Sequence, residues 1–293
     1  MPLVQLENVK LNYLLLGPAE SVEDGPTLVM VHGLATNLAF WYGIASTLAN
    51  SYRVLLLDLR GHGRSSMPPS GYTPSHMAAD LQELLKTLEI ATTVLIGHSF
   101  GGAVVLHCAL QASCQIERIV LADVRLKQFQ PQQQPQDWPH WPQLQKTLAT
   151  LNIHLAEDEP EAGYRLLVEM ARLQVEQPQA MATVQGLSSL YPQGAGLGTM
   201  QRWLKLLDTT TAWQEFIADD GLTQSHLQML QKPTLALYGE HSPTLMTGRQ
   251  LQVCWPHFQL ELVSSAGHFF PLSQPQTFIA HLERFLACPH AAN

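Results

Sequence analysis

Ser99 stands at the centre of the pentapeptide Gly97-His98-Ser99-Phe100-Gly101, which has the pattern G-x-S-x-G. This pattern is typical of a serine on a sharp strand-to-helix turn, where the hydroxyl is lifted above a sheet as a nucleophile. A side chain at position 97 or 101 would collide with adjacent backbone in such a turn, so glycine suits both places. The amino end of the following helix favours the negative charge that develops during attack on a carbonyl carbon. The motif therefore predicts acyl transfer through Ser99.

The elements that must position Ser99 can be read on either side of it. Residues 93–96 have the composition of a strand and residues 100–111 that of a helix. The same alternation of short apolar strands with amphipathic helices fills the rest of residues 1–123, after an opening hairpin. The clearest helix start is Thr73-Pro74-Ser75, where a capping hydroxyl precedes a proline. This alternation predicts an α/β fold with a mostly parallel sheet covered on both faces.

The pattern changes at Val124. Glutamine and proline crowd residues 127–145, and helical patterns continue to about residue 221, interrupted by a glycine-rich stretch at 194–198. Strand character returns at residues 234–238 and 258–263, and a last helix is expected over 276–286. We predict a core of residues 1–123 and 223–293 and a helical cap of residues 124–222. Trp138 and Trp141 favour a packed surface segment over a disordered linker for the glutamine-rich stretch.

Composition excludes several classes of protein. The chain is 46% hydrophobic and 14% charged, with a formal net charge of −8, which argues against disorder and against nucleic-acid binding. No apolar run approaches the roughly 20 residues that span a bilayer. The first residues lack the basic segment of a signal peptide, and the four cysteines form no CxxC pair. We expect a cytoplasmic protein with a small-molecule substrate, and the sequence leaves its oligomeric state open.

Four segments together resemble the α/β-hydrolase superfamily. Besides the turn at Ser99, Val31-His32-Gly33-Leu34 resembles the HG turn of that family. The run from Asp58 to Ser65 resembles its D-x-x-G-x-G-x-S loop, and Ala266-Gly267-His268 resembles its terminal histidine segment. The resemblance covers residues 1–123 and 230–290. It implies an eight-stranded, mostly parallel sheet with a helical cap inserted after the sixth strand.

The resemblance also implies the partners of Ser99. A serine hydroxyl needs a base, and His268 occupies the family position for it. The backbone N–H groups of Leu34 and Phe100 are the expected donors to the oxyanion. His32 is then expected to shape the HG turn and His62 to belong to a structural loop.

The third member of the site departs from the family pattern. The usual acid follows the seventh strand, where this chain has Gly239-Glu240-His241-Ser242, with Ser242 at the acidic position. Some members of the family, including certain dehalogenases and polyketide-pathway thioesterases, place the acid after the sixth strand instead. Asp123 stands there. Glu240, displaced by two residues, is the alternative, and we favour Asp123.

The substrate is expected to be hydrophobic. Ser99 argues against haloalkane dehalogenases and epoxide hydrolases, which need an aspartate at this position. The sequence has neither a dinucleotide fingerprint nor an HExxH motif, so no cofactor or metal is implied. The leading hypothesis is a serine hydrolase that cleaves an ester or thioester with an acyl or aromatic group. A carbon–carbon hydrolase and a non-catalytic ligand-binding protein are the alternatives. Pocket candidates are His98, Trp141, Trp203 and Phe269. Most large side chains of the cap are expected to pack it onto the sheet, and the remainder to line a largely apolar pocket. Arg202 is expected on the cap surface, with contact to an anionic tail of the substrate as the alternative. The large side chains of the cap are Trp138, Trp141, Tyr164, Leu166, Leu167, Met170, Tyr191, Met200, Trp203 and Leu204.

Overall fold

The computed structural model of the chain describes residues 2–17, 25–111, 114–132, 134–138, 140–179 and 196–288. Eight strands form one sheet in the order β1-β2-β4-β3-β5-β6-β7-β8. Their bounds are β1 Leu3–Gln5, β2 Lys10–Leu16, β3 Thr27–Val31, β4 Val54–Leu57, β5 Thr92–His98, β6 Gln115–Ala122, β7 Thr234–Gly239 and β8 Phe258–Val263.

The sheet is parallel except at one end. Strand β1 pairs antiparallel with β2, which pairs antiparallel with β4, and every other pairing is parallel. The predicted eight-stranded, mostly parallel α/β sheet and the opening hairpin are therefore confirmed. Because parallel strands end at the same edge, the loops that follow β3, β5, β6, β7 and β8 meet above that edge.

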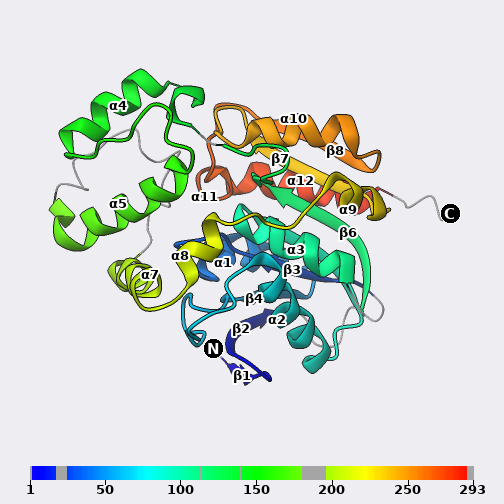
Figure 1. The fold of residues 1–293 in the computed structure, drawn as a ribbon. Coiled ribbons are helices and arrows are strands. Elements are labelled where there is room, and N and C mark those ends of the chain that lie inside the picture. The colour runs from blue at the N-terminus through cyan, green and yellow to red at the C-terminus, as the bar shows by residue number, and fades with distance from the viewer. Residues whose placement is uncertain are drawn as a thin grey trace.

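Helices cover both faces of the sheet (Figure 1). Alternate residues of a strand point to opposite faces, and the central strands are apolar on both. In β3, for example, Val29 and Val31 join the core beneath α2 and α3, whereas Leu28 and Met30 join the core beneath α1 and α12. The helices that belong to the core are α1 Ala39–Leu48, α2 Pro74–Thr87, α3 Phe100–Gln111, α10 Leu245–Cys254, α11 Phe270–Ser273 and α12 Pro275–Ala287. As predicted, the hydroxyl of Thr73 caps α2 by accepting the N–H of His76 (3.3 Å).

The secondary-structure elements described between β6 and β7 are helices. Figure 1 shows α4, α5 and α7 grouped at one side of the molecule, away from the sheet. The glutamine-rich stretch packs as expected, with Trp138 and Trp141 both buried and the Gln130 amide donating to the carbonyl of Pro243 (2.7 Å). The elements are the short 3₁₀ turn η1 Pro135–Asp137 and the helices α4 Trp141–Thr150, α5 Ala162–Glu176, α7 Leu197–Thr209, α8 Ala212–Ile217 and α9 Gln224–Met229. Tyr191 and part of the glycine-rich stretch lie outside the described residues.

Arg202 of α7 is a contact between these helices and the core. Its Nε donates to the carbonyl of Gly61 (3.0 Å), and its Nη2 donates to the carbonyl of Ser65. The loop that follows β4 therefore holds α7 in place. The side chain is not the free surface group that the sequence suggested.

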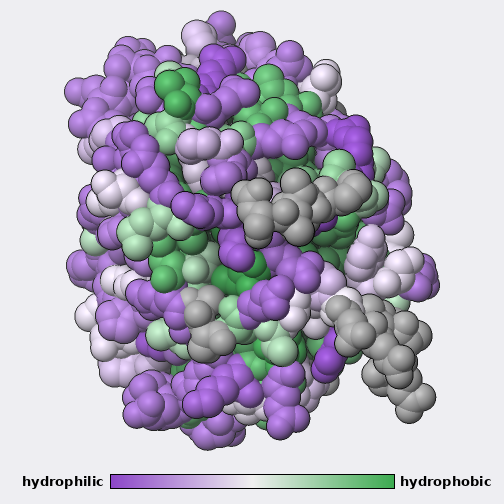
Figure 2. Space-filling view, turned by 90° about the vertical axis from the view of Figure 1, so that its right-hand side faces the viewer, coloured by the Kyte–Doolittle hydropathy of each residue, from purple (hydrophilic) through white to green (hydrophobic). Residues whose placement is uncertain are grey.

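One face of the molecule is predominantly polar. Figure 2 shows the side of the molecule that lies on the right in Figure 1, where hydrophilic residues predominate and hydrophobic side chains appear between them in groups. Within the described parts of the chain, we find no helix with the length and apolar character needed to cross a bilayer.

Candidate active site

Ser99 lies on the sharp turn between β5 and α3. Its φ of 53° is in the left-handed region, which a residue with a side chain adopts only when its surroundings enforce it. A Cβ on Gly97 would lie 2.5 Å from the carbonyl oxygen of Gly101, and a Cβ on Gly101 would lie 2.5 Å from that of His32. The two glycines of the motif therefore allow β3, β5 and α3 to approach closely enough to form the turn.

His268 connects Ser99 to Asp123. Its Nε2 lies 3.0 Å from the Oγ of Ser99, and its Nδ1 lies 2.7 Å from Oδ1 of Asp123. His268 is on the loop after β8, and Asp123 directly follows β6 with a φ of 55°. The backbone N–H of Asp123 donates to the carbonyl of Leu237 in β7 (2.8 Å). Three loops at one edge of the sheet thus bring a hydroxyl, an imidazole and a carboxylate into line.

Asp123 is buried and fully bonded. Its Oδ2 accepts the N–H of Gly239 (2.8 Å), and its Oδ1 accepts the hydroxyls of Ser242 and Thr244 (2.5 Å for Thr244) as well as the imidazole. Burial acts to raise the pKa of Asp123, but the hydrogen bonds from His268, Ser242 and Thr244 and the attraction of the imidazole outweigh burial and lower it. The carboxylate is therefore ionised near neutral pH and can stabilise an imidazolium.

Glu240 has a different place. Its side chain is exposed, and its Oε2 accepts the backbone N–H of Ser265 (3.0 Å) at the start of the loop that carries His268. The imidazole bonds to Asp123 instead. Of the two acids considered from the sequence, the structure brings Asp123 to His268.

The HG turn packs directly against Ser99. A Cβ on Gly33 would lie 3.0 Å from the Cβ of Ser99, so the backbone of this turn lies beside the nucleophile. His32 fixes the turn: its Nε2 accepts the N–H of Leu59 (3.1 Å), and its Nδ1 donates to the carbonyl of Gly33 (2.7 Å). Burial lowers the pKa of His32 to about 4, so the ring is neutral near pH 7.

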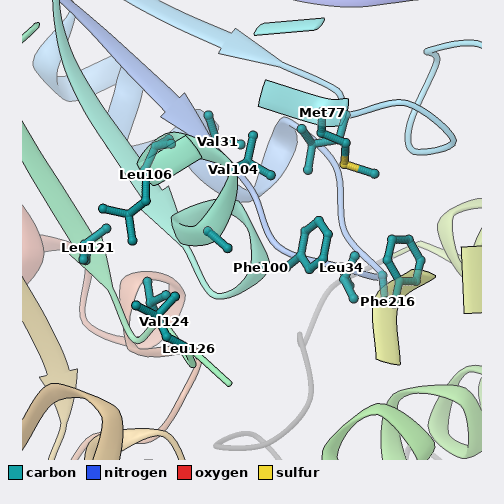
Figure 3. Close-up of a cluster of buried hydrophobic side chains, with 14 of the residues drawn as sticks. Val31, Leu34, Met77, Phe100, Val104, Leu106, Leu121, Val124, Leu126 and Phe216 are labelled. Carbon is teal, nitrogen blue, oxygen red and sulfur yellow. The ribbon is translucent and has the colours of Figure 1, made fainter. Parts of the chain in front are cut away.

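Leu34 and Phe100 are held by the core. Figure 3 shows their side chains beside Phe216, and the rings of Phe100 and Phe216 are 5.2 Å apart. Both side chains are buried, and this packing restrains the backbone at positions 34 and 100. That their N–H groups stabilise an oxyanion stays a prediction from the sequence.

Two cavities open at Ser99. Cavity A, of about 70 Å³, is bordered by Ser99, His268, Trp138, Leu166, Leu167 and Pro243. Cavity B, of about 30 Å³, is bordered by Ser99, Phe100, Pro74, Ala103, Ala218 and Phe216, with the charged side chains of Lys127, Glu215 and Asp220. Arg125 and Tyr164 border both cavities. The substrate would lie across these two spaces.

The four pocket candidates from the sequence lie elsewhere. None of His98, Trp141, Trp203 and Phe269 is among the described residues that border cavity A or cavity B. Trp141 packs against Trp138 (ring centroids 5.9 Å apart), and Trp203 stacks on Phe216 (5.6 Å). The large side chains between β6 and β7 that do border cavity A include Trp138, three residues before Trp141, and Leu167 of α5.

His98 lies behind the site. Its ring stacks on Phe40 (4.5 Å) and lies 5.6 Å from that of Phe269, and its Nε2 donates to the carbonyl of His268 (3.0 Å). Burial, together with the neighbouring His268, lowers the pKa of His98 to about 3. A neutral His98 therefore supports the loop that carries His268 and does not contact the substrate space.

Sequence reasoning missed Arg125, Phe216 and Thr244. Arg125 is held by Glu161 (Nη1 to Oε2, 2.7 Å) and by the carbonyls of Gln130 and Pro131. Its place two residues after Asp123 was the only signal of its position.

Among the described residues, no cluster of three or more histidine, cysteine, aspartate or glutamate side chains is arranged to hold a metal ion.

The profile of the alpha/beta hydrolase fold family matches residues 26–275 of the chain. The chain belongs to this family. A relative from Nitrosomonas europaea, named pimeloyl-[acyl-carrier protein] methyl ester esterase, is 27% identical over 89% of this chain and 96% of its own. The uncharacterized protein Mb2734 of Mycobacterium bovis is 34% identical over 98 residues, which are 33% of this chain and only 29% of that relative. Other relatives of this chain are named as lipases, an epoxide hydrolase and a dehalogenase.

Solved structures share the fold. That of the enol-lactonase from Burkholderia xenovorans LB400 superposes with a TM-score of 0.67 at 20% identity, over 98% of this chain and 100% of that one. That of the carboxylesterase CesB from Bacillus subtilis gives 0.66 at 22% identity, over 97% and 90%. These similarities extend over nearly the whole hydrolase fold of this chain.

Proposed function

We propose that the chain is a serine hydrolase that cleaves an ester or thioester of a hydrophobic substrate without a cofactor. The observation that carries this proposal is the imidazole of His268, placed 3.0 Å from the hydroxyl of Ser99 and 2.7 Å from the carboxylate of Asp123. The esterase and lipase names among the relatives support it. On the sequence grounds given above, we also propose that it acts in the cytoplasm and that residues 124–222 form its cap.

Each residue has a defined part in the proposed reaction. Nε2 of His268 takes the proton of Ser99 as its Oγ attacks the carbonyl carbon, and the N–H groups of Leu34 and Phe100 stabilise the oxyanion. The imidazolium then gives this proton to the departing oxygen or sulfur, which leaves an acyl group on Ser99. Water attacks the acyl-enzyme with the same proton transfers and releases the acid. Asp123 fixes the tautomer of His268 and stabilises its charged form.

The non-catalytic alternative loses its support. It rested on Ser242 at the position where the family usually has its acid. Since Asp123 bonds to His268 from the end of β6, and Ser242 bonds to Asp123, a serine at position 242 is compatible with catalysis. Carbon–carbon bond cleavage would use the same three side chains, and no contact in the site favours it.

Hydrolysis of a series of p-nitrophenyl esters tests the proposal, with Ser99→Ala as the control. We expect turnover by the wild type and its loss in the variant. Turnover that persists in Ser99→Ala, or none by the wild type on any ester or thioester tested, would contradict it.

A further inference from the structure

Cavities A and B differ in the part of the site that borders them. His268 borders cavity A, and Phe100 borders cavity B, whereas Ser99 borders both. The nucleophile therefore lies between a space on the side of the base and a space on the side of the oxyanion donor.

The chemistry assigns one half of the substrate to each side. The departing oxygen must lie near Nε2 of His268, because it receives its proton from there when its bond to the carbonyl carbon breaks. The carbonyl oxygen lies at the N–H groups of Leu34 and Phe100. The leaving group thus extends into cavity A, and the acyl chain extends from the carbonyl carbon into cavity B.

The wall of cavity A suits an apolar group. Trp138, Leu166, Leu167 and Pro243 give it an apolar side, and Arg125 is the one ionic side chain other than His268 among the described residues that border it. Burying methylene groups against such a wall removes apolar surface from water and favours binding. A leaving group of several carbons gains affinity from this cavity.

The wall of cavity B does not suit a long chain. It is the smaller space, and four ionic side chains border it, Arg125, Lys127, Glu215 and Asp220. Nζ of Lys127 donates to Glu161 (3.1 Å). The carboxylate of Asp220 accepts the backbone N–H groups of Lys127 (2.7 Å) and Leu222 (2.9 Å). The carboxylate of Glu215 accepts the backbone N–H of Tyr72 (2.6 Å). Because ionic side chains of both signs border this cavity, an anionic or a cationic acyl group would face a like charge there. A long apolar chain would strip water from these side chains without replacing its hydrogen bonds.

We propose that the substrate is an ester or thioester with a short, uncharged acyl group and a larger hydrophobic leaving group. This inference rests on the proposed serine hydrolase function. It assigns the hydrophobic part of the substrate to the alcohol or thiol rather than to the acid.

Two isomeric esters distinguish a long chain on the leaving group from a long chain on the acyl group. Hexyl acetate and methyl heptanoate have the same atoms, with the long chain on the leaving side in the first and on the acyl side in the second. We expect kcat/KM, measured by acid release at constant pH, to be at least about tenfold higher for hexyl acetate. Equal values, or a preference for methyl heptanoate, would overturn the assignment.

Substitutions in the two cavities provide the matched controls. Leu167→Phe narrows cavity A and should lower the ratio of hexyl acetate to methyl acetate turnover by about tenfold. Ala103→Val narrows cavity B and should instead lower the ratio of p-nitrophenyl butanoate to p-nitrophenyl acetate turnover. If Ala103→Val does not fold, Ala218→Leu narrows the same cavity from an exposed position.

The failure of this inference is distinguishable from that of the proposed function. If the wild type hydrolyses no ester, or Ser99→Ala is as active as the wild type, the proposed function fails. If hydrolysis depends on Ser99 but Leu167→Phe changes the acyl ratio and the cavity B variants change the alcohol ratio, only the assignment of the two halves is wrong.

Discussion

Asp123 receives hydrogen bonds from two segments of the chain, residues 239–244 and the loop that carries His268. The imidazole of His268 and the hydroxyls of Ser242 and Thr244 donate to one oxygen, and the N–H of Gly239 donates to the other. Ser242 and Thr244 follow β7, at the place where the family usually carries the acid itself. The loop after β7 thus contributes two hydroxyls to the site, and these hydroxyls bind Asp123, which follows β6.

Replacing Asp123 by asparagine should lower kcat by about 10⁴-fold, because an amide neither fixes the reactive tautomer of His268 nor stabilises its charge. Glu240→Gln is the matched control, since Glu240 bonds to Ser265 and is exposed. We expect it to retain activity within a few-fold of the wild type, measured on p-nitrophenyl acetate. If Glu240→Gln is the inactive variant and Asp123→Asn is active, the acid is misassigned.

The position of Ser242 allows the acid to be moved. Because its Oγ contacts the carboxylate of Asp123, an aspartate at 242 in the Asp123→Asn background would place a carboxylate beside His268. We expect the double variant Asp123→Asn/Ser242→Asp to be at least about tenfold more active than Asp123→Asn alone. Asp123→Asn/Ser242→Asn, which has the same shape without the charge, should show no recovery. Equal activity of the two double variants would contradict a carboxylate role at this point.

At the scale of elements, the turn at Ser99 depends on the close packing of α3 against β3. Gly101→Ala would put a Cβ 2.5 Å from the carbonyl oxygen of His32 and 2.6 Å from that of Val31. Backbone atoms cannot rotate away, so we expect about 1–3 kcal/mol of lost stability in urea unfolding, with loss of activity as α3 shifts.

Gly43→Ala is the control for this variant. Gly43 is exposed in the middle of α1, and no atom lies within 4 Å of the Cβ that alanine would add. Alanine is the better helix former, so this change should stabilise the fold by about 0.5–1 kcal/mol. If both substitutions destabilise the protein equally, contact with β3 is not the cause.

The sequence predicted elements where the signal is local. The turn at Ser99, the start of α2 at Thr73 and the apolar central strands all follow from short patterns of residues. Helix α10 was missed, because its stretch, Leu245–Cys254, shows no clear apolar stripe, and half of its ten residues are polar or glycine. The residues bordering the cavities were harder to predict. Trp138 and Trp203 are both tryptophans and both buried, but only Trp138 borders cavity A. The packing of segments distant in sequence decides this difference, and no short pattern of residues shows it.

At the scale of the whole molecule, three buried histidines make the fold sensitive to acid. Burial lowers the pKa of His32 to about 4 and those of His62 and His98 to about 3, from 6.5 in the unfolded chain. Between these values the unfolded chain binds more protons than the folded one, so stability falls as the pH falls below about 6.5. Asp80 and Asp220, whose pKa values are raised by burial, act in the opposite direction.

A variant isolates this effect from that of the carboxylates. His62→Asn removes one buried imidazole, and its slope of unfolding free energy against pH should be shallower by about 1.4 kcal/mol per pH unit between about pH 6 and pH 4. The packing that it loses against Trp203 shifts the curve without changing its slope. An unchanged slope in His62→Asn would show that His62 is not held neutral in the folded state.

The proposed function requires that His268 activates Ser99 as a nucleophile. Treatment with a fluorophosphonate, followed by mass spectrometry of the intact protein and its peptides, tests this directly. We predict one adduct per chain, on Ser99, formed at the rate at which esterase activity is lost, with labelling slowed strongly in His268→Ala and absent in Ser99→Ala. An adduct on another residue, or labelling of Ser99 that is as fast in His268→Ala as in the wild type, would contradict the account.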